Sequence, residues 1–233
     1  GINDKEYPPR SISGAISQAK NQLLTPAGFE RQAYDQFSHT VAKVYHLYQE
    51  KISRNNAVDF DDLIFLTVRL FKEYPQVLAY YQDRFRHILV DEYQDTNHAQ
   101  YVLINLLAEK HRNLLVVGDP DQGIYSWRGA DINNILSFER DYPEARVIKL
   151  ERNYRSTGAI LEAANHLIRY NINRKDKKLW TEAGQGAPLV SYFGEDERAE
   201  AEYVVDCILR LKEEEKRQYK DFAVFYRTHA QSR

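Results

Sequence analysis

The sequence predicts an α/β fold in which a parallel sheet with its helices follows an all-helical N-terminal part. Up to about residue 55, apolar residues recur with a helical period and no strand pattern appears. From residue 56, short apolar segments alternate with helical segments, as in βαβ units. A second alternation follows a boundary near residue 156, so we expect the start of another α/β domain there.

The N-terminal part is predicted to hold a short helix over 11–22 and a long helix over 25–52. Thr25 followed by Pro26 is a typical helix start, with an N-cap and a proline in the first turn. The long helix has one apolar face, formed by Phe29, Ala33, Phe37, Val41, Val44, Tyr48 and Ile52.

The middle part begins with a predicted helix over 59–74. Strands are then expected at 87–90, 113–119 and 145–151, separated by helices at 98–111 and 131–142. Because these strands are continuously apolar, we expect a sheet that is covered on both faces.

The last part is predicted to begin with a helix over 156–171 that Ser156 caps. Strands at 189–194 and 221–227 and a helix at 196–217 follow.

The composition is that of an ordinary globular chain, since 43% of the 233 residues are hydrophobic and 28% are charged. The formal net charge is −2, so any nucleic-acid surface has to be a local patch. No apolar run approaches the roughly 18–20 residues of a membrane span, and no signal peptide opens the chain. We therefore expect a cytoplasmic protein without a membrane partner.

Cys207 is the one cysteine, which excludes an internal disulfide and a cysteine-based metal site. It lies on a predicted apolar helix face, so we expect it in the core rather than as a nucleophile. The sequence begins with Gly1, contains no methionine and stops soon after a predicted strand, so we expect a piece of a longer protein.

Polar residues follow each of the three middle strands, at 91–92, 118–122 and 151–155. Because the carboxyl ends of parallel strands share one edge of a sheet, we expect these residues to lie together. They combine carboxylates, an amide, an aromatic ring and guanidinium groups. This mixture suits a nucleoside triphosphate with a divalent metal, although exposed loop carboxylates are the alternative for 91–92 alone.

Three further segments have two interpretations each. The aromatic and arginine residues of 125–128 suit stacking on unpaired bases, but Trp127 could equally pack in the core. For Asp59–Asp62 we favour acidic residues in a helix first turn over a metal site. For Asn173–Lys178 we favour a solvated charged face over a phosphate contact. The seven histidines show no metal-binding spacing such as HExxH.

Five segments together resemble the superfamily 1 DNA helicases of the UvrD/PcrA/Rep type, nearest to the PcrA and UvrD members. They are VDEYQDTN, VVGDPDQGIYSWRGADI and LERNYRS, which resemble helicase motifs II, III and IV, with VDFDDL and AVFYRTHAQSR. The resemblance implies a partial RecA-like fold of the P-loop NTPase type. Residues 1–55 would form the helical subdomain 1B, 56–155 the C-terminal part of RecA-like domain 1A, and 156–233 the N-terminal part of RecA-like domain 2A.

The resemblance implies the following roles at an ATP site. Asp91 would hold Mg²⁺, and Glu92 would activate the attacking water. Gln122 would sense the γ-phosphate and link the site to DNA. Tyr154 would stack on the adenine, and Arg155 would act as an arginine finger.

For DNA, the resemblance implies that Tyr125 and Trp127 stack on single-stranded bases with Arg128 beside them. Gln94 and Asp95 would tie the motifs together. The partners would be single-stranded DNA, junctions of single-stranded with duplex DNA, and repair or replication proteins.

The implied activity is ATP-dependent 3′–5′ translocation and duplex unwinding. Two departures stand out. Gly123 replaces the serine common in the family, and no G-x-x-x-x-G-K-[ST] phosphate-binding loop occurs in the chain. The isolated chain is therefore expected to be inactive, with a sheet edge through which it could self-associate. The alternatives are a non-catalytic DNA- or protein-binding platform and a subunit of a helicase-nuclease.

Overall fold

The computed structural model describes residues 3–172, 174 and 176–232. The chain divides into two compact units. The first comprises Gly1–Leu150 with Leu167–Lys178, and the second comprises Glu151–His166 with Leu179–Arg233. Each unit is described by itself.

Three helices open the first unit: α1 (Pro9–Asn21), α2 (Pro26–Glu30) and α3 (Gln36–Arg54). The predicted single helix over 25–52 is wrong, because a capping box starts a new helix at Asp35. The carboxylate of Asp35 accepts from the backbone N–H of Ser38, and the Ser38 hydroxyl accepts from the backbone N–H of Asp35.

These helices share one apolar core. Its buried members are Ile12, Ile16, Ala19, Val41 and Tyr45. The core fixes α1 against α3 and so determines where the end of α1 lies.

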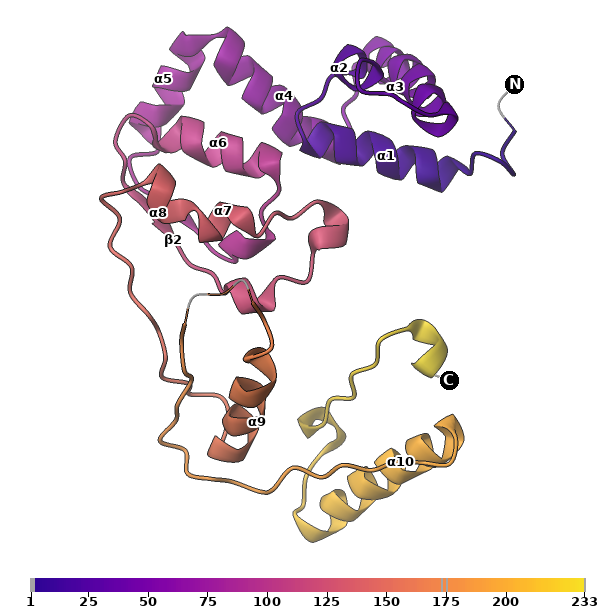
Figure 1. The fold of residues 1–233 in the computed structure, drawn as a ribbon, viewed down its shortest axis with the longest axis vertical. Coiled ribbons are helices and arrows are strands. Elements are labelled where there is room, and N and C mark those ends of the chain that lie inside the picture. The colour runs from indigo at the N-terminus through magenta and orange to yellow at the C-terminus, as the bar shows by residue number, and fades with distance from the viewer. Residues whose placement is uncertain (1–2, 173, 175, 233) are drawn as a thin grey trace. The chain divides into compact units, whose positions relative to one another are not determined.

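The middle of the unit consists of α4 (Phe60–Glu73), α5 (Pro75–Arg84), β1 (Ile88–Val90), α6 (His98–Ala108) and β2 (Leu114–Val116). The sequence did not predict α5, which begins at Pro75 as a helix with proline in its first turn. The helix α4 packs against α1, α5 and α6 (Figure 1).

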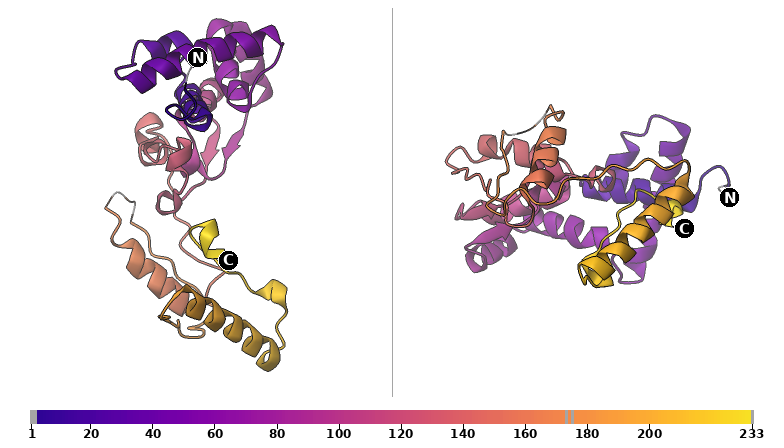
Figure 2. Two further views of the ribbon diagram at one scale, coloured as in Figure 1. Left: turned by 90° about the vertical axis from the view of Figure 1, so that its right-hand side faces the viewer. Right: turned by 90° about the horizontal axis from the view of Figure 1, so that it is seen from below.

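The two strands are parallel and lie side by side, as the left view of Figure 2 shows. Leu89 pairs with Leu115, and their side chains are 73% and 54% exposed on one face of the sheet. The prediction of a sheet covered on both faces is therefore wrong for this chain. Within the described residues the sheet has only two strands. The face that carries Leu89 and Leu115 therefore lacks the helices that cover both faces of a larger parallel sheet.

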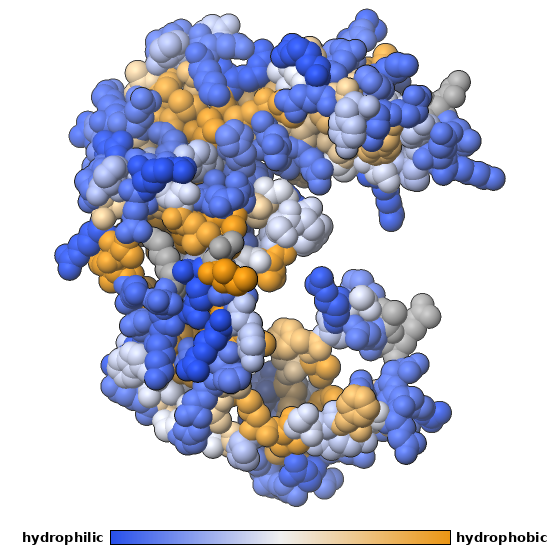
Figure 3. Space-filling model, in the orientation of Figure 1, coloured by the Kyte–Doolittle hydropathy of each residue, from blue (hydrophilic) through white to orange (hydrophobic). Residues whose placement is uncertain are grey.

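Three of the five predicted strands do not form. The segments 145–151, 189–194 and 221–227 contain no regular strand. A strand needs a hydrogen-bonded neighbour, and apolar composition alone does not supply one. The segments instead expose apolar side chains, and Figure 3 shows apolar groups on the surface of both units.

The rest of the first unit is built from short elements. The predicted helix over 131–142 is split into α7 (Asn133–Leu136) and α8 (Phe138–Asp141). Three 3₁₀ turns carry the polar motifs: η1 (Tyr93–Asp95), η2 (Pro120–Gln122) and η3 (Ser126–Arg128).

The second unit contains most of α9 (Gly158–Ile168), α10 (Glu197–Glu214) and the 3₁₀ turns η4 (Tyr219–Asp221) and η5 (His229–Ser232). Cys207 is only half-buried on α10, so its predicted place in the core is wrong. No residue of α10 is buried, because the unit provides few apolar partners for it.

Candidate functional site

The register of the two strands determines which loops meet. Beyond β2, the backbone N–H of Val117 donates to Val90 O at 2.8 Å, and that of Tyr93 donates to Val117 O at 2.9 Å. These bonds place the turn after β1 beside the turn after β2, at the carboxyl edge of the sheet. This is the edge at which open α/β sheets bind ligands.

Asp91 and Glu92 are the first residues beyond β1, and both are exposed. Glu92 adopts a left-handed backbone conformation with φ of 49°. Its N–H donates to Oδ1 of Asp91 at 2.9 Å, which stabilises the sharp turn. The turn presents two carboxylates to solvent at the edge of the sheet.

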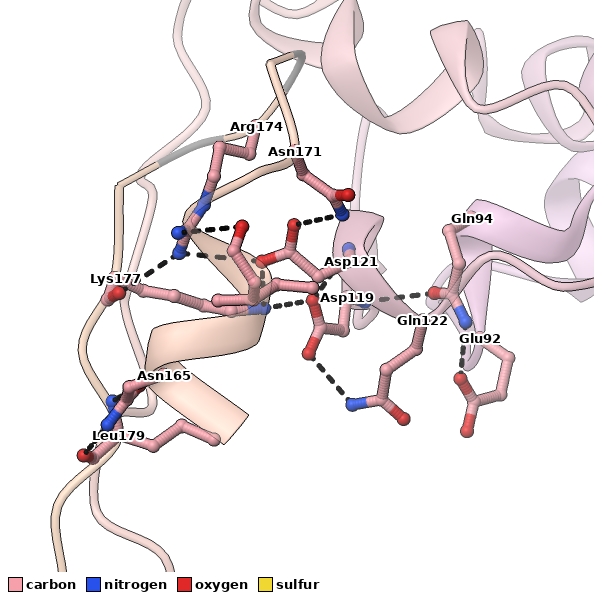
Figure 4. Close-up of polar contacts among 11 residues, drawn as sticks. Glu92, Gln94, Asp119, Asp121, Gln122, Asn165, Asn171, Arg174, Lys177 and Leu179 are labelled. Carbon is pink, nitrogen blue, oxygen red and sulfur yellow. Dashed lines mark hydrogen bonds and ion pairs between the residues drawn. The ribbon is translucent and has the colours of Figure 1, made fainter. Parts of the chain in front are cut away.

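Gln94 links the two turns and is only 2% exposed. Its Nε2 donates to Oε2 of Glu92 at 2.6 Å, and its Oε1 accepts from the backbone N–H of Asp119 at 2.9 Å (Figure 4). Gly118 leaves room for this contact, because a Cβ there would lie 2.6 Å from Oε1 of Gln94. The amide therefore holds Glu92 and the second turn together.

The carboxylate of Asp119 accepts hydrogen bonds from three donors in and beside the second turn. Its Oδ2 accepts from Nε2 of Gln122 at 2.8 Å, and its Oδ1 accepts from the N–H of Asp121 at 2.9 Å and from Lys177. Burial raises the pKa of Asp119, but the hydrogen bonds from Lys177, Gln122 and the backbone outweigh burial. Its pKa therefore lies below the ordinary value, and the carboxylate is ionised at neutral pH.

Arg174 and Lys177 lie against this turn, and we call the described residues among 171–177 the basic loop. Nζ of Lys177 is 3.4 Å from Oδ2 of Asp121, and a guanidinium nitrogen of Arg174 is 3.5 Å from the same oxygen. The favoured prediction of a solvated charged face is therefore wrong for Arg174 and Lys177, whose side chains are largely buried. Asn173 and Lys175, part of the same prediction, lie outside the described residues.

The aromatic motif of η3 is open to solvent. Trp127 is 68% exposed, so the alternative that it packs in the core is wrong. Its ring centroid is 6.4 Å from that of Tyr125, and the Arg128 guanidinium carbon lies 4.6 Å from Trp127 and 5.2 Å from Tyr125. Exposed rings beside a cation form a surface that can stack on bases and attract phosphate.

Tyr154 and Arg155 belong to the second unit, and both are exposed. The guanidinium carbon of Arg152 lies 4.8 Å from the Tyr154 ring. The N–H groups of Arg155 and Ser156 donate to Oδ1 of Asn153 at 2.9 and 2.7 Å, which fixes the backbone that carries both side chains.

The acidic segment at α4 has a structural role. Asp61 and Asp62 lie in the first turn of α4, as the favoured interpretation predicted, and Asp59 caps the helix in a capping box with Asp62. The fully buried Nζ of Lys20 lies 2.6 Å from Asp59 and 2.8 Å from Asp62.

The described residues contain no cluster of three or more metal-binding side chains. Asp91 nevertheless fits Mg²⁺, which proteins commonly hold through one or two carboxylates together with phosphate oxygens and water.

Sequence reasoning missed Lys20 and the pairing of Asp119 with Lys177. Lys20 had a signal, because it continues the buried stripe of Ile12 and Ile16 at steps of four residues. The pairing of Asp119 with Lys177 had none, since it joins positions 58 residues apart.

Comparison with known proteins extends over the whole chain. Residues 1–143 match the model of the UvrD/REP helicase N-terminal domain, and residues 148–233 match that of the UvrD-like helicase C-terminal domain. Over 232 residues and 100% of this chain, the sequence is 52% identical to the ATP-dependent DNA helicase PcrA of Leuconostoc citreum and 55% identical to that of Staphylococcus aureus strain Mu50. The chain covers 31% and 32% of these relatives, about a third of their length. Among the described residues, no helix is both long and apolar enough to span a membrane.

Proposed function

The chain belongs to the UvrD/REP helicase family, and we propose that it contributes part of the ATP site and part of the DNA-binding surface of an ATP-driven DNA helicase. The protein would translocate 3′ to 5′ along single-stranded DNA and unwind duplexes at junctions, in repair or replication. The division into 1–55, 56–155 and 156–233 is retained as part of this proposal.

One observation carries the proposal. Glu92, the residue assigned to water activation, is joined through Gln94 to the turn that holds Gln122, the residue assigned to phosphate sensing. A water-activating carboxylate and a phosphate sensor have to be placed relative to each other with a precision of a fraction of an ångström. The short, buried Gln94 bridge supplies that placement.

The chemistry follows from the groups at the sheet edge. Glu92 would accept a proton from the water that attacks the γ-phosphate, and the Gln94 amide would keep its carboxylate oriented. Asp91 would hold Mg²⁺, which supplies charge neutralisation on the phosphate oxygens. Gln122 would contact the γ-phosphate. In the second unit, Tyr154 would stack on adenine.

The charge that develops on the transferred phosphoryl group would be stabilised by Arg155, as an arginine finger does. On the DNA side, Trp127 and Tyr125 would stack on successive bases while Arg128 contacts phosphate.

The test uses the full-length protein that contains this chain. With single-stranded DNA, ATP, and Mg²⁺, Glu92→Gln should lower kcat by about 10²–10⁴-fold, the usual contribution of a general base, while ATP still binds. Glu109→Gln, at an exposed glutamate, is the matched control and should hydrolyse ATP like the wild type. An unchanged rate in Glu92→Gln would refute the role of Glu92.

A second candidate function is a DNA-binding platform without catalysis, for which the exposed cluster of Tyr125, Trp127 and Arg128 would suffice. The 233-residue chain alone is expected to bind single-stranded DNA without hydrolysing ATP. The expectation would be contradicted if the isolated chain hydrolysed ATP and Glu92→Gln abolished that hydrolysis. Lack of DNA-stimulated hydrolysis in the full-length protein would favour the platform.

A further inference from the structure

The basic loop holds two largely buried cations, Arg174 and Lys177, against the turn that carries Gln122. We propose that Lys177 and Arg174 are positioning residues for ATP hydrolysis, which act by neutralising Asp119 and Asp121 and so fix the Gln122 side chain. The inference rests on the proposed function, since it concerns the same ATP site.

The first step concerns charge. Asp119 and Asp121 are two residues apart, and the Asp121 side chain is only 5% exposed. Two carboxylates so placed repel each other and lose hydration, which costs free energy unless cations lie beside them. Lys177 contacts both carboxylates, and Arg174 contacts Asp121, so the basic loop supplies one cation for each anion.

The second step concerns geometry. The two oxygens of Asp119 face different partners: Oδ1 faces Lys177, and Oδ2 accepts from the Gln122 amide at 2.8 Å. Lys177 therefore fixes the rotation of the carboxylate group, and the carboxylate fixes the amide of Gln122. Without the cation, Oδ1 would keep the Asp121 N–H but lose its charged partner, so the carboxylate and the Gln122 amide bound to it would be held less firmly.

The third step concerns the loop itself. The Arg174 guanidinium donates to the carbonyl oxygens of Ile168 at 3.4 Å and Lys177 at 3.1 Å. Arg174 thus closes the loop on itself and places the Lys177 side chain at Asp119. Asn171 adds a contact of 3.4 Å to Oδ1 of Asp121.

The fourth step links the loop to the water-activating residue. The backbone N–H of Asp119 donates to Gln94, whose amide in turn holds Glu92. A shift of this turn therefore disturbs both Gln122 and Glu92 (Figure 4). Disturbing two groups that act together in the transition state lowers kcat more than it weakens substrate binding.

The test is steady-state ATP hydrolysis by the full-length protein with single-stranded DNA. Lys177→Met should lower kcat by about 10–100-fold, the effect of displacing a catalytic group by about 1 Å, with the KM for ATP changed less than about 3-fold. Lys177→Arg, which keeps the cation, should restore most of kcat. Arg169→Met removes an exposed cation near the loop and should match the wild type.

A double variant separates positioning from simple destabilisation. If Lys177 acts through Gln122 and, by way of Gln94, through Glu92, Lys177→Met should lower kcat by a clearly smaller factor in a Gln122→Ala background than in the wild type, since residues that act as a unit are not additive. Full multiplication of the two effects would overturn the inference. So would an unchanged kcat in Lys177→Met of an active protein, and this result would leave the proposed function intact. An inactive wild type would overturn both.

A spectroscopic measurement on the 233-residue chain is independent of turnover. The side-chain amide resonances of Gln122, assigned by their loss in Gln122→Ala, should shift in Lys177→Met and stay in place in Arg169→Met. Gln122 resonances that are identical in Lys177→Met and wild type would contradict the inference even if the activity had fallen.

Discussion

Nε2 of the buried Gln94 donates to Oε2 of Glu92 at 2.6 Å, while Oε1 of the same amide accepts from the backbone of Asp119. One side chain thus connects the two turns that follow β1 and β2. Glu92 itself is exposed, so the hydrogen bond from Gln94 restrains the orientation of its carboxylate at the sheet edge.

Gln94→Met should remove the bridge at similar volume. The Asp119 N–H would lose its acceptor, and because this donor is only partly buried the loss should cost about 1 kcal/mol of unfolding free energy. In the full-length protein, kcat for ATP should fall by about 10-fold or more, because Glu92 loses its orientation. Urea denaturation and steady-state kinetics measure the two effects, with Gln76→Met at an exposed glutamine as control.

Gly118→Ala tests the same contact without a change in polar groups. The added Cβ would lie 2.6 Å from Oε1 of Gln94 and 2.8 Å from Cδ1 of Ile135, so one of them has to move. Overpacking of this kind costs about 1–3 kcal/mol. Gly14→Ala, where a Cβ meets open space on α1, is the control and should be neutral or stabilising. Equal melting temperatures for the two variants would argue against the close contact.

Lys20→Met should be among the most destabilising single changes in the chain. It leaves Asp62, whose side chain is fully buried, without its cation, and removing one partner of a buried pair costs about 3–5 kcal/mol. Combining it with Asp59→Asn and Asp62→Asn should recover part of the loss, because the unpaired charges are then gone. Thermal or urea unfolding of the two variants checks this; a triple variant less stable than Lys20→Met would contradict it.

Acid should weaken the first unit through Asp59. Burial raises the pKa of Asp59, but hydrogen bonds from Lys20, the Asp62 backbone and Tyr48 outweigh burial and leave the pKa below its ordinary value. A pKa lowered by folding stabilises the protein above the unfolded value of about 3.9, and this contribution is lost as pH falls through the folded pKa. Urea midpoints between pH 6 and pH 3 should decline less steeply in Asp59→Asn than in the wild type.

Alkali should act on the same cluster through Tyr48. Burial and the hydrogen bond to Asp59 raise the pKa of Tyr48 to about 12. A raised tyrosine pKa stabilises the fold below the unfolded value of about 10, and the contribution is lost as pH rises toward 12. In a spectrophotometric titration, Tyr48→Phe should remove a late-ionising tyrosine. If Tyr48→Phe and the wild type showed the same number of tyrosines ionising late in the titration, the raised pKa of Tyr48 would be contradicted.

Trp127→Ala should weaken single-stranded DNA binding by about 10–100-fold, since stacking on one base contributes about 1–3 kcal/mol. The dependence of affinity on salt should stay the same, because no cation is removed. Arg128→Gln should instead reduce the slope of log K against log salt by about one phosphate contact. Fluorescence anisotropy measures both, with Tyr34→Ala at an exposed ring as control.

The sequence predicted the parts of the structure that depend on local signals. The periodicity of α1 and α6 and the acidic cap of α4 were readable, because they depend on neighbours within about one helical turn. The two strands that form, β1 and β2, pair directly with each other, and α6 connects them in the sequence, as βαβ alternation predicts.

What failed depended on distant partners. The segments at 145–151, 189–194 and 221–227 have strand-like composition but no adjacent strand in the described chain. The break between α2 and α3 was missed because Ser38 looks like an ordinary surface residue until Asp35 starts a capping box with it. At the site, the resemblance singled out the motif residues, and their roles stay predictions. The contact between Asp119 and Lys177 could not be predicted from the sequence, because it depends on how the chain returns to the sheet edge.

The register of β1 and β2 also has a consequence for handling the chain in solution. Leu89 and Leu115 pair directly, so their exposed side chains form adjacent apolar surface on one face of a narrow sheet. The attraction between such surfaces is entropic near room temperature and weakens on cooling. Solutions of the chain should therefore scatter more light on warming, reversibly and below the unfolding transition, and Leu89→Lys with Leu115→Thr should suppress this turbidity.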